Sequence, residues 1–501
     1  DIGVTGVQTC ALPISFASTR FRQPGTAGHS KDLSNVPQFR VAEIELRQTP
    51  VVLRMPFRFG VVTLRRCHQA FVRTRIETTD GKSYWGVAAE MIVPKWFDKN
   101  PALSDEDNFE QQRSVLRWAR EAYLADSRPA TAFGHFVRHH HAHQRFCEAR
   151  GFNPLLANYG PALIDRAVLD ALCRYTHQSF YSVISSNLAG LDASMQEFAD
   201  IDMSAFVGTL RPATTIHARH TVGMVDAITR ADVLEPADDG LPETLQEVVR
   251  AYGHRYFKIK VGGNLDADMD RLKAIASVLD SLPYEYKLSL DGNEQYPDAD
   301  SLLVLLQRMR GSPALRRLCA SVLFVEQPIA RQHALSIDLR RNDPGWPVII
   351  DESDGLLDAF VQARACGYSG ISSKTCKGVY RSLLNAARCA QWNGEQNSRR
   401  YFMSAEDLTV QAGLSLQQDL ALVNLIGITH VERNGHHYVN GLASRPAAEQ
   451  QAFLRAHPDV YMNSHGAARL RIEGGQISLG SLDAVGYAST VVPDFSAMDL
   501  I

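Results

Sequence analysis

From residue 213 onward the chain alternates short apolar segments with longer amphipathic ones, and this rhythm constrains the fold more than any other feature. The apolar segments have the length and β-branched content of strands, whereas the segments between them, such as 266–282 and 378–392, show helical spacing. The predicted strands are 215–219, 256–261, 286–290, 321–325, 348–350, 370–373, 401–403 and 426–431. Eight strands with helical connections over roughly 220 residues predict a (β/α)₈-type barrel, near the lower end of its usual size of about 250 residues.

The sequence before the barrel has a different order, with strands first and helices after. Alternating apolar residues predict strands at 41–46, 51–55, 70–78 and 84–88, and the turn sequence Thr79-Asp-Gly-Lys82 precedes the last of them. Helical patterns follow at 94–126 and 161–175. We therefore expect an α+β domain over residues 41–205, a barrel over 206–434 and a C-terminal segment, 435–501, that packs back on the first domain.

The first residues need a separate interpretation. Residues 1–15 lack the basic start of a signal peptide, and 4–14 read like the translation of a common sequencing adapter. We interpret 1–15 as an artefact and 16–40 as a loose leader.

Composition excludes several classes of protein. The 52 basic and 55 acidic residues give a formal net charge of −3, which offers no basic surface for nucleic acid. No apolar run approaches the about 18 residues that a membrane span needs. The eight cysteines form no CxxC pair, so we expect reduced thiols and a cytoplasmic location.

Charged residues follow most of the predicted barrel strands, where a packed core would have apolar ones. Lys258 and Lys260 lie on one face of a strand because side chains alternate. Acids follow the next three strands and a lysine follows the one after: Asp291, Glu326, Asp351 and Lys374. Neighbouring strands are about 4.8 Å apart, so these carboxylates converge at the barrel mouth and repel unless a cation lies among them. Three carboxylates with additional oxygen ligands suit Mg²⁺, with Mn²⁺ as the alternative.

Together these motifs resemble those of the enolase superfamily, and specifically its muconate-lactonizing-enzyme-like subgroup (the mandelate racemase/muconate lactonizing enzyme family). The resemblance extends from about residue 41 to 490 and rests on Lys258-x-Lys260, Asp291-x-Asn293, Glu326-Gln-Pro, Asp351-Glu-Ser and Ser372-x-Lys374. It implies a modified (β/α)₇β TIM-like barrel, with an α+β capping domain formed by the N-terminal region and the C-terminal tail. It also implies a magnesium site of Asp291, Glu326 and Asp351, proton abstraction α to a substrate carboxylate, and a homo-oligomer.

The same resemblance assigns roles to the lysines. Lys260 becomes the base on one face of the substrate, with Lys258 tuning it, and Lys374 stands on the opposite face. A lysine beside a cation and a second ammonium has a lowered pKa, towards the about 7–8 that suits a general base. Asn293 and Glu352 are expected behind the metal ligands.

Four further residues are candidates for substrate binding. Arg58 and Phe59 lie where the family has its specificity loop, and Arg58 could pair with a distal carboxylate. His220 follows the first barrel strand and Glu406 the seventh. The run His135-Phe-Val-Arg-His-His-His-Ala-His143 contains five imidazoles but no acid or cysteine, so we interpret it as a solvated or interface segment of an enlarged cap.

We therefore expect a Mg²⁺-dependent enzyme that passes through an enediolate, a racemase or epimerase or a cycloisomerase, acting on a small-molecule carboxylate. One alternative is a dehydratase of the same superfamily, which eliminates water from a hydroxy acid. The other is a paralogue that binds metal without catalysis. Neither nucleic acid nor a membrane is an expected partner.

Overall fold

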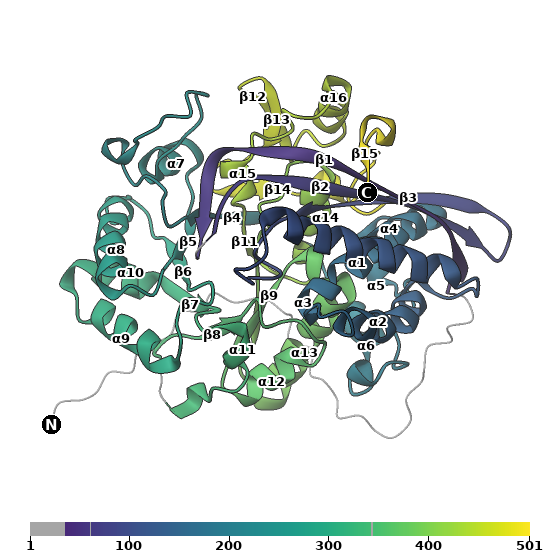
Figure 1. Ribbon diagram of the computed structural model, residues 1–501, viewed down its shortest axis with the longest axis horizontal. Coiled ribbons are helices and arrows are strands. Elements are labelled where there is room, and N and C mark those ends of the chain that lie inside the picture. The colour runs from purple at the N-terminus through teal and green to yellow at the C-terminus, as the bar shows by residue number, and fades with distance from the viewer. Residues whose placement is uncertain (1–35, 61, 342–343) are drawn as a thin grey trace.

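The computed structural model describes residues 36–60, 62–341 and 344–501. It has an antiparallel sheet with helices packed on it, next to a closed barrel (Figure 1). The predicted artefact, 1–15, and most of the predicted leader lie outside the described residues. No helix in the described part of the chain is long and apolar enough to cross a membrane.

The cap sheet is built from three long strands. β1 (Phe39–Phe59), β2 (Val62–Thr78) and β3 (Ser83–Ile92) pair antiparallel in chain order. The segments 41–46 and 51–55 are therefore parts of one strand, which continues past a register shift between Val52 and Phe57. The expected specificity loop is the end of this strand and the tip of the β1–β2 hairpin, rather than a separate loop.

The helices of the cap are α1 (Asp105–Ala125), α2 (Ala132–Glu148), α3 (Pro154–Ala157), α4 (Tyr159–Thr176), α5 (Phe180–Ser185) and α6 (Met203–Val207). Of these, α1 and α4 pack directly on the sheet. α4 lies so close to β3 that a Cβ at Gly86 would be 2.1 Å from the Ala167 carbonyl oxygen. Only glycine allows this approach.

The histidine run is part of α2, and four of its five histidines are buried, so the solvated alternative of our interpretation as a solvated or interface segment was wrong. His135, His139, His140 and His143 are each at most 8% exposed, whereas His141 lies on the outer face. Their helical spacing turns them towards the cap core, where His135 Nε2 donates to the Phe39 carbonyl oxygen at 2.8 Å. An enlarged cap thus uses imidazoles as core aromatics.

The eight predicted barrel strands are confirmed, and all of them pair in parallel with their neighbours. They are β4 (Thr215–Val222), β5 (Tyr256–Lys260), β6 (Lys287–Asp291), β7 (Val322–Glu326), β8 (Val348–Ile350), β9 (Gly370–Ser373), β10 (Phe402–Ala405) and β11 (His430–Glu432). β11 pairs with β4, which closes the barrel.

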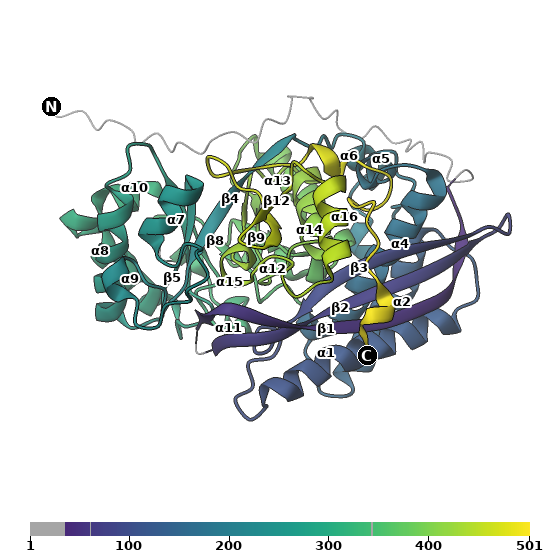
Figure 2. The same ribbon diagram turned by 90° about the horizontal axis from the view of Figure 1, so that it is seen from above.

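The helices of this region are α7 (Leu245–Tyr252), α8 (Leu265–Leu279), α9 (Ala299–Arg310), α10 (Arg316–Ser321), α11 (Arg331–Ala334), α12 (Ala359–Ala365), α13 (Val379–Gln396), α14 (Leu414–Leu425) and α15 (Gly435–Tyr438). All twelve residues of α14 are buried, because it packs between the barrel and the cap (Figure 2). Its buried residues include polar ones, so the helix has no solvated polar face: Ser415, Gln417, Gln418, Asp419 and Asn424.

The C-terminal tail contacts both parts of the molecule. After α16 (Ala447–Ala456), β12 (Tyr461–Ser464) and β13 (Ala467–Leu470) form a hairpin. β14 (Gln476–Ser478) pairs antiparallel with barrel strand β4, and β15 (Asp499–Leu500) pairs with cap strand β1. The tail therefore extends the cap sheet at one end and the barrel sheet at the other.

Candidate active site

The cavity at the barrel mouth lies between the cap and the carboxyl ends of the barrel strands. It is a partly open pocket whose empty space, including solvent at its mouth, amounts to about 340 Å³. The cap contributes apolar walls, and the barrel contributes most of the polar groups. The lining residues are Phe57, Phe59, Val93 and Trp96 from the cap, and Lys258, Lys260, Asp291, Asn293, Lys374, Asp407, Leu408, Thr409, Glu432 and Asn434 from the barrel.

Lys258 is the centre of a buried ionic cluster. Its Nζ lies 2.7 Å from Glu406 Oε2, 2.8 Å from Asp291 Oδ2 and Glu326 Oε2, and 3.2 Å from Glu432 Oε2. The lysine is 1% exposed. Burial lowers its pKa, but the four carboxylates outweigh burial and raise the pKa well above its ordinary value. Lys258 is therefore a fixed ammonium that links the ends of strands β5, β6, β7, β10 and β11.

Lys260 and Lys374 both line the cavity, each paired with one carboxylate. Lys260 Nζ donates to Asp291 Oδ2 at 2.6 Å, and Lys374 Nζ donates to Asp351 Oδ2 at 2.7 Å. Lys260 ends β5, and Lys374 follows β9. Three strands separate β5 from β9 in either direction around the closed barrel. The two amines therefore come from diametrically opposite sides of the mouth.

A cap residue covers Lys374. Its Nζ lies 4.1 Å from the centre of the Trp96 ring, which is within the range of a cation–π contact. Burial lowers the pKa of Lys374, and Asp351 raises it, so that the net direction is upward. Carboxylates thus hold both Lys258 and Lys374 in their charged forms.

The three expected metal ligands are only partly assembled. Asp291 and Glu326 are register neighbours on β6 and β7, and both contact Lys258. Asp351 instead pairs with Lys374 and with Lys377, and it accepts a hydrogen bond from Ser372. Among the described residues, no three His, Cys, Asp or Glu side chains form a ready-made metal site. The expected convergence of all three is therefore not found, because lysines and Ser372 satisfy the Asp351 carboxylate.

The chemistry of the cluster nevertheless suits a hard cation. Glu326 is fully buried, and its Oε2 accepts no well-aligned hydrogen bond from any described residue. Burial raises the pKa of Glu326 well above its usual range, and the carboxylates of Asp291 and Glu406 raise it further. A divalent cation that prefers oxygen ligands stabilises a buried carboxylate that the neighbouring carboxylates repel. The residues present therefore fit a magnesium ion.

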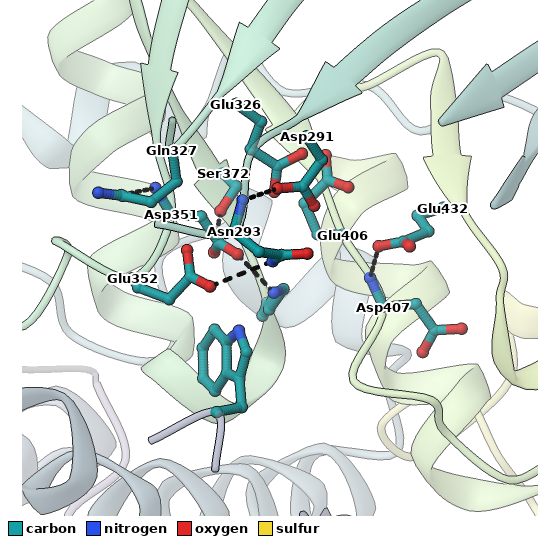
Figure 3. Close-up of polar contacts among 12 residues, drawn as sticks. Asp291, Asn293, Glu326, Gln327, Asp351, Glu352, Ser372, Glu406, Asp407 and Glu432 are labelled. Atoms are coloured by element: carbon teal, nitrogen blue, oxygen red, sulfur yellow. Dashed lines mark hydrogen bonds and ion pairs between the residues drawn. The ribbon is translucent and has the colours of Figure 1, made fainter. Parts of the chain in front are cut away.

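The two residues expected behind the metal ligands lie against each other. Asn293 Nδ2 donates to Glu352 Oε1 at 3.3 Å, and the Asn293 N–H donates to Asp291 Oδ1 at 2.9 Å (Figure 3). Lys99, from the cap, lies 3.5 Å from Glu352 Oε1 and donates to the Asn293 carbonyl oxygen at 2.9 Å. Burial raises the pKa of Glu352, and Lys99 opposes this shift. A cap lysine thus contacts this side of the site.

Of the four candidates for substrate binding, Phe59 alone is among the described residues that line the cavity. Phe57 and Phe59 lie on one face of β1, so the alternation of side chains places Arg58 on the other. His220 packs between His254 and His437, with ring centres 5.4 and 4.9 Å away, and does not line the cavity. Glu406 pairs with Arg219 and Lys258 beneath the cavity. These three side chains therefore lie outside the described lining of the cavity.

Several lining residues were missed at the sequence level. Glu432 ends strand β11 and follows an apolar segment, as the other acids at strand ends do, so the sequence carried a usable signal for it. Asp407 accepts hydrogen bonds from the Val410 and Gly435 N–H groups, and burial raises its pKa to about 7. Trp96 and Lys99 come from a cap segment that sequence alone could not place over the barrel. In Figure 3, Glu432 and Asp407 lie to one side of the Asp291, Glu326 and Glu406 group.

Comparison with known proteins agrees with this geometry. Residues 240–436 match the family described as enolase C-terminal domain-like. No curated protein matches the chain.

Solved structures match over most of the chain. A mandelate racemase/muconate lactonizing protein from Herpetosiphon aurantiacus is 15% identical with a TM-score of 0.57, covering 90% of this chain and 98% of its own. A dipeptide epimerase from Enterococcus faecalis, complexed with Mg and L-Leu-L-Tyr, is 15% identical with a TM-score of 0.58, covering 90% and 99%. Muconate lactonizing enzyme from Pseudomonas fluorescens, complexed with muconolactone, is 16% identical with a TM-score of 0.55, covering 92% and 97%.

At these identities the likeness shows the fold, which is a TIM-type barrel with a capping domain. The family match adds that residues 240–436, which hold seven of the eight barrel strands, are similar to enolase C-terminal domain-like proteins. The structural neighbours of the chain are epimerases, racemases and lactonizing enzymes.

Proposed function

We propose that this chain is a Mg²⁺-dependent racemase or epimerase that moves the proton α to a substrate carboxylate from one face of the carbon to the other. The observation that carries the proposal is the pair of opposed lysines. Lys260 and Lys374 line one cavity from diametrically opposite strands, and each is held by a carboxylate 2.6–2.7 Å away. Inversion at a carbon needs an acid–base group on each face, and this arrangement supplies both.

The step proceeds as follows. The neutral amine of Lys260 takes the α-proton from one face, the C–H bond breaks, and its electron pair moves into the carboxylate to give an enediolate. The ammonium of Lys374 then donates a proton to the opposite face, and a new C–H bond forms. Reversal exchanges the two roles. Phe57, Phe59 and Trp96 exclude water from this side of the cavity.

Asp291, Glu326 and Asp351 are the residues that would hold the metal ion. When bound, Mg²⁺ or Mn²⁺ supplies positive charge that stabilises the negative charge accumulating on the substrate's carboxylate oxygens. Lys258 holds Asp291 and Glu326 next to each other from behind.

The charge of the lining supports one substrate class over another. No arginine lines the described part of the cavity, and its remaining polar wall carries Asp407, Glu432, Thr409 and Asn434. A dicarboxylate such as muconate needs a cation for its second carboxylate, and this wall offers acids and neutral polar groups instead. We therefore infer a carboxylate whose other end is an amine or a neutral hydrogen-bonding group. This favours an epimerase over a cycloisomerase of dicarboxylates.

Deuterium exchange tests the proposal. Dipeptides, N-acylamino acids, acid sugars and muconates are incubated with enzyme and Mg²⁺ in D₂O and followed by NMR and mass spectrometry. We expect deuterium at the α-carbon of both stereoisomers without loss of water. Loss of water would identify a dehydratase instead. Absence of exchange, with Mg²⁺ still raising the melting temperature, would favour a metal-binding paralogue without catalysis.

The family resemblance also suggests a homo-oligomer, and we retain this as part of the proposal. Light scattering coupled to size exclusion measures the mass of the assembly against the 55.5 kDa chain.

A further inference from the structure

The turn that follows Lys374 is anchored from outside the barrel. This turn, η6 (Thr375–Lys377), begins directly after the lysine. The Thr375 hydroxyl donates to Glu90 Oε2 at 3.0 Å, and the Thr375 N–H donates to Asp419 Oδ1 at 3.3 Å. Glu90 is part of cap strand β3, whereas Asp419 is part of barrel helix α14. The backbone beside Lys374 is therefore held by one carboxylate from each domain.

Glu90 is itself fixed in place. It forms an ion pair of 3.0 Å with Arg166 of cap helix α4, and both side chains are buried to within 1% exposure. Ser415 of α14 donates to its other oxygen at 3.5 Å. A buried ion pair has a defined geometry, because separating the two side chains would leave each charge unpaired in an apolar environment. Glu90 thus links the cap to the turn beside Lys374 through the Thr375 hydroxyl.

The backbone after Lys260 has a different environment. The Val261 N–H donates to the Asp291 carbonyl oxygen, and the N–H groups of Gly262 and Gly263 donate to Asp268 of helix α8. These partners all belong to the barrel. The two opposed lysines therefore differ, since a polar contact from the cap holds the turn beside Lys374, whereas barrel groups hold the turn beside Lys260.

We propose that Glu90 is a positioning residue for Lys374, acting through the Thr375 hydroxyl, so that docking of the cap sets the Lys374 half of the reaction and leaves the Lys260 half unchanged. This inference rests on the proposed function, in which each lysine handles the proton on one face. In this proposal, a cap residue that is remote from the substrate controls one of the two stereochemical directions.

The test compares Thr375→Val with Thr375→Ser. Valine has the shape of threonine but no hydroxyl, and it leaves the Glu90–Arg166 pair intact, whereas serine keeps the donor. Exchange of the α-proton in D₂O is measured separately for each stereoisomer, and Lys260→Ala and Lys374→Ala assign each isomer to its lysine. We expect Thr375→Val to slow exchange of the Lys374 isomer roughly tenfold, with the Lys260 isomer within about twofold of wild type. Thr375→Ser should behave like wild type.

Equal slowing of both isomers, or slowing of neither, would overturn the inference. A second readout does not depend on turnover. The chain has ten lysines, so selective ¹³Cε labelling of lysine gives an NMR spectrum with few signals. The signal that is missing from the spectrum of Lys374→Arg belongs to Lys374. Lys374 lies over the Trp96 indole, and its resonance is therefore shifted by the ring. We expect Thr375→Val to move this resonance and Thr375→Ser to preserve it. If wild type shows no exchange, the proposed function fails, and the resonance alone decides whether Glu90 positions Lys374.

Discussion

The core of the cap and the mouth of the barrel both bury ionisable side chains, but opposite charges offset burial to different extents in the two regions. In the cap core, defined here as Tyr123, His135, His139 and Asp165, burial is the largest cause of every pKa shift, and each shift favours the neutral form. At the barrel mouth, oppositely charged groups outweigh burial at Lys258 and Asp351, which keep their charges, whereas burial dominates at Glu326 and Asp407 and raises their pKa values.

This difference follows from the roles of the two regions. A neutral imidazole stacked on an aromatic ring packs much like a phenyl group, as His139 does on Tyr123 at 4.3 Å. Charged groups are retained at the mouth although taking each ion out of water is costly. That cost is offset only where ions of opposite charge face one another, as Lys258 and its four carboxylates do. The cap core thus packs neutral ionisable groups, whereas the mouth retains charged ones at Lys258 and Asp351.

The largest expected effect comes from removing the proposed base. Lys260→Ala should lower turnover by about a thousandfold or more, since positioned acid–base groups contribute roughly 10²–10⁴-fold. Stability should fall as well, because Lys260 is buried and its removal leaves the buried Asp291 carboxylate with Lys258 as its remaining ionic partner. Steady-state kinetics and thermal unfolding measure the two effects. Lys273→Ala, on the exposed face of α8, is the matched control. Unchanged turnover in Lys260→Ala would remove this lysine from the mechanism.

A pair of variants tests the comparison in terms of stability. Arg219→Met leaves Glu406 buried beside Lys258 without its fully buried guanidinium partner, and should lower the free energy of unfolding by about 3–5 kcal/mol. His139→Phe in the cap keeps the stack on Tyr123 and should change it by less than about 1.5 kcal/mol at pH 8. Urea unfolding measures both. Similar losses for the two variants would contradict the distinction between paired charges and neutral groups.

Sequence was sufficient for those parts of the molecule that local pattern determines. The barrel strands were predictable because short apolar segments ended in charged residues at regular intervals, and the lysines and acids occur at those ends. Glu432 was missed although it carries the same signal. The partners of these groups were not predictable, because Ser372 and Lys377 satisfy Asp351 only once the turn after β9 is folded.

The cap was harder to predict for a physical reason. Whether His135 or His139 is solvated depends on which face of α2 meets the sheet, and polar residues give no hydrophobic period to follow. The side of β1 that carries Arg58 depends on the register shift between Val52 and Phe57, which no local pattern specifies. Long-range packing decided both outcomes.

A pH profile examines the neutral groups of the cap core directly. Asp165 is fully buried with Tyr123 as its hydrogen-bond donor at 2.6 Å, and burial raises its pKa from 3.8 to about 7. The native state therefore holds this proton more tightly than the unfolded state. The resulting stability is fully present below pH 3.8 and is lost as the pH rises to about 7, a change of the order of 4 kcal/mol.

Asp165→Asn removes that titration. Urea unfolding of both proteins is measured from about pH 4 to 7. Over this range the free energy of unfolding of wild type should decline relative to that of Asp165→Asn. His139, with its pKa lowered to about 4, acts in the opposite direction: it destabilises the native state as the pH falls from 6.5 to 4. Asp232→Asn, in an exposed barrel turn, is the control. A parallel pH dependence in wild type and Asp165→Asn would show that Asp165 is ionised in the folded cap.

The smallest expected effect concerns the place where the two regions meet. Phe59 lines the cavity from the cap, whereas its neighbour Arg58 lies on the other face of β1. Because an apolar wall contributes binding energy but no proton transfer, Phe59→Ala should raise KM about tenfold with little change in kcat. Arg58→Ala should leave both constants within about twofold of wild type, although the two residues are adjacent. Magnesium affinity, measured by calorimetry, should be the same in both variants, since the proposed ligands all belong to the barrel. A rise in KM for Arg58→Ala that exceeds the rise for Phe59→Ala would mean that the hairpin presents its opposite face to the substrate.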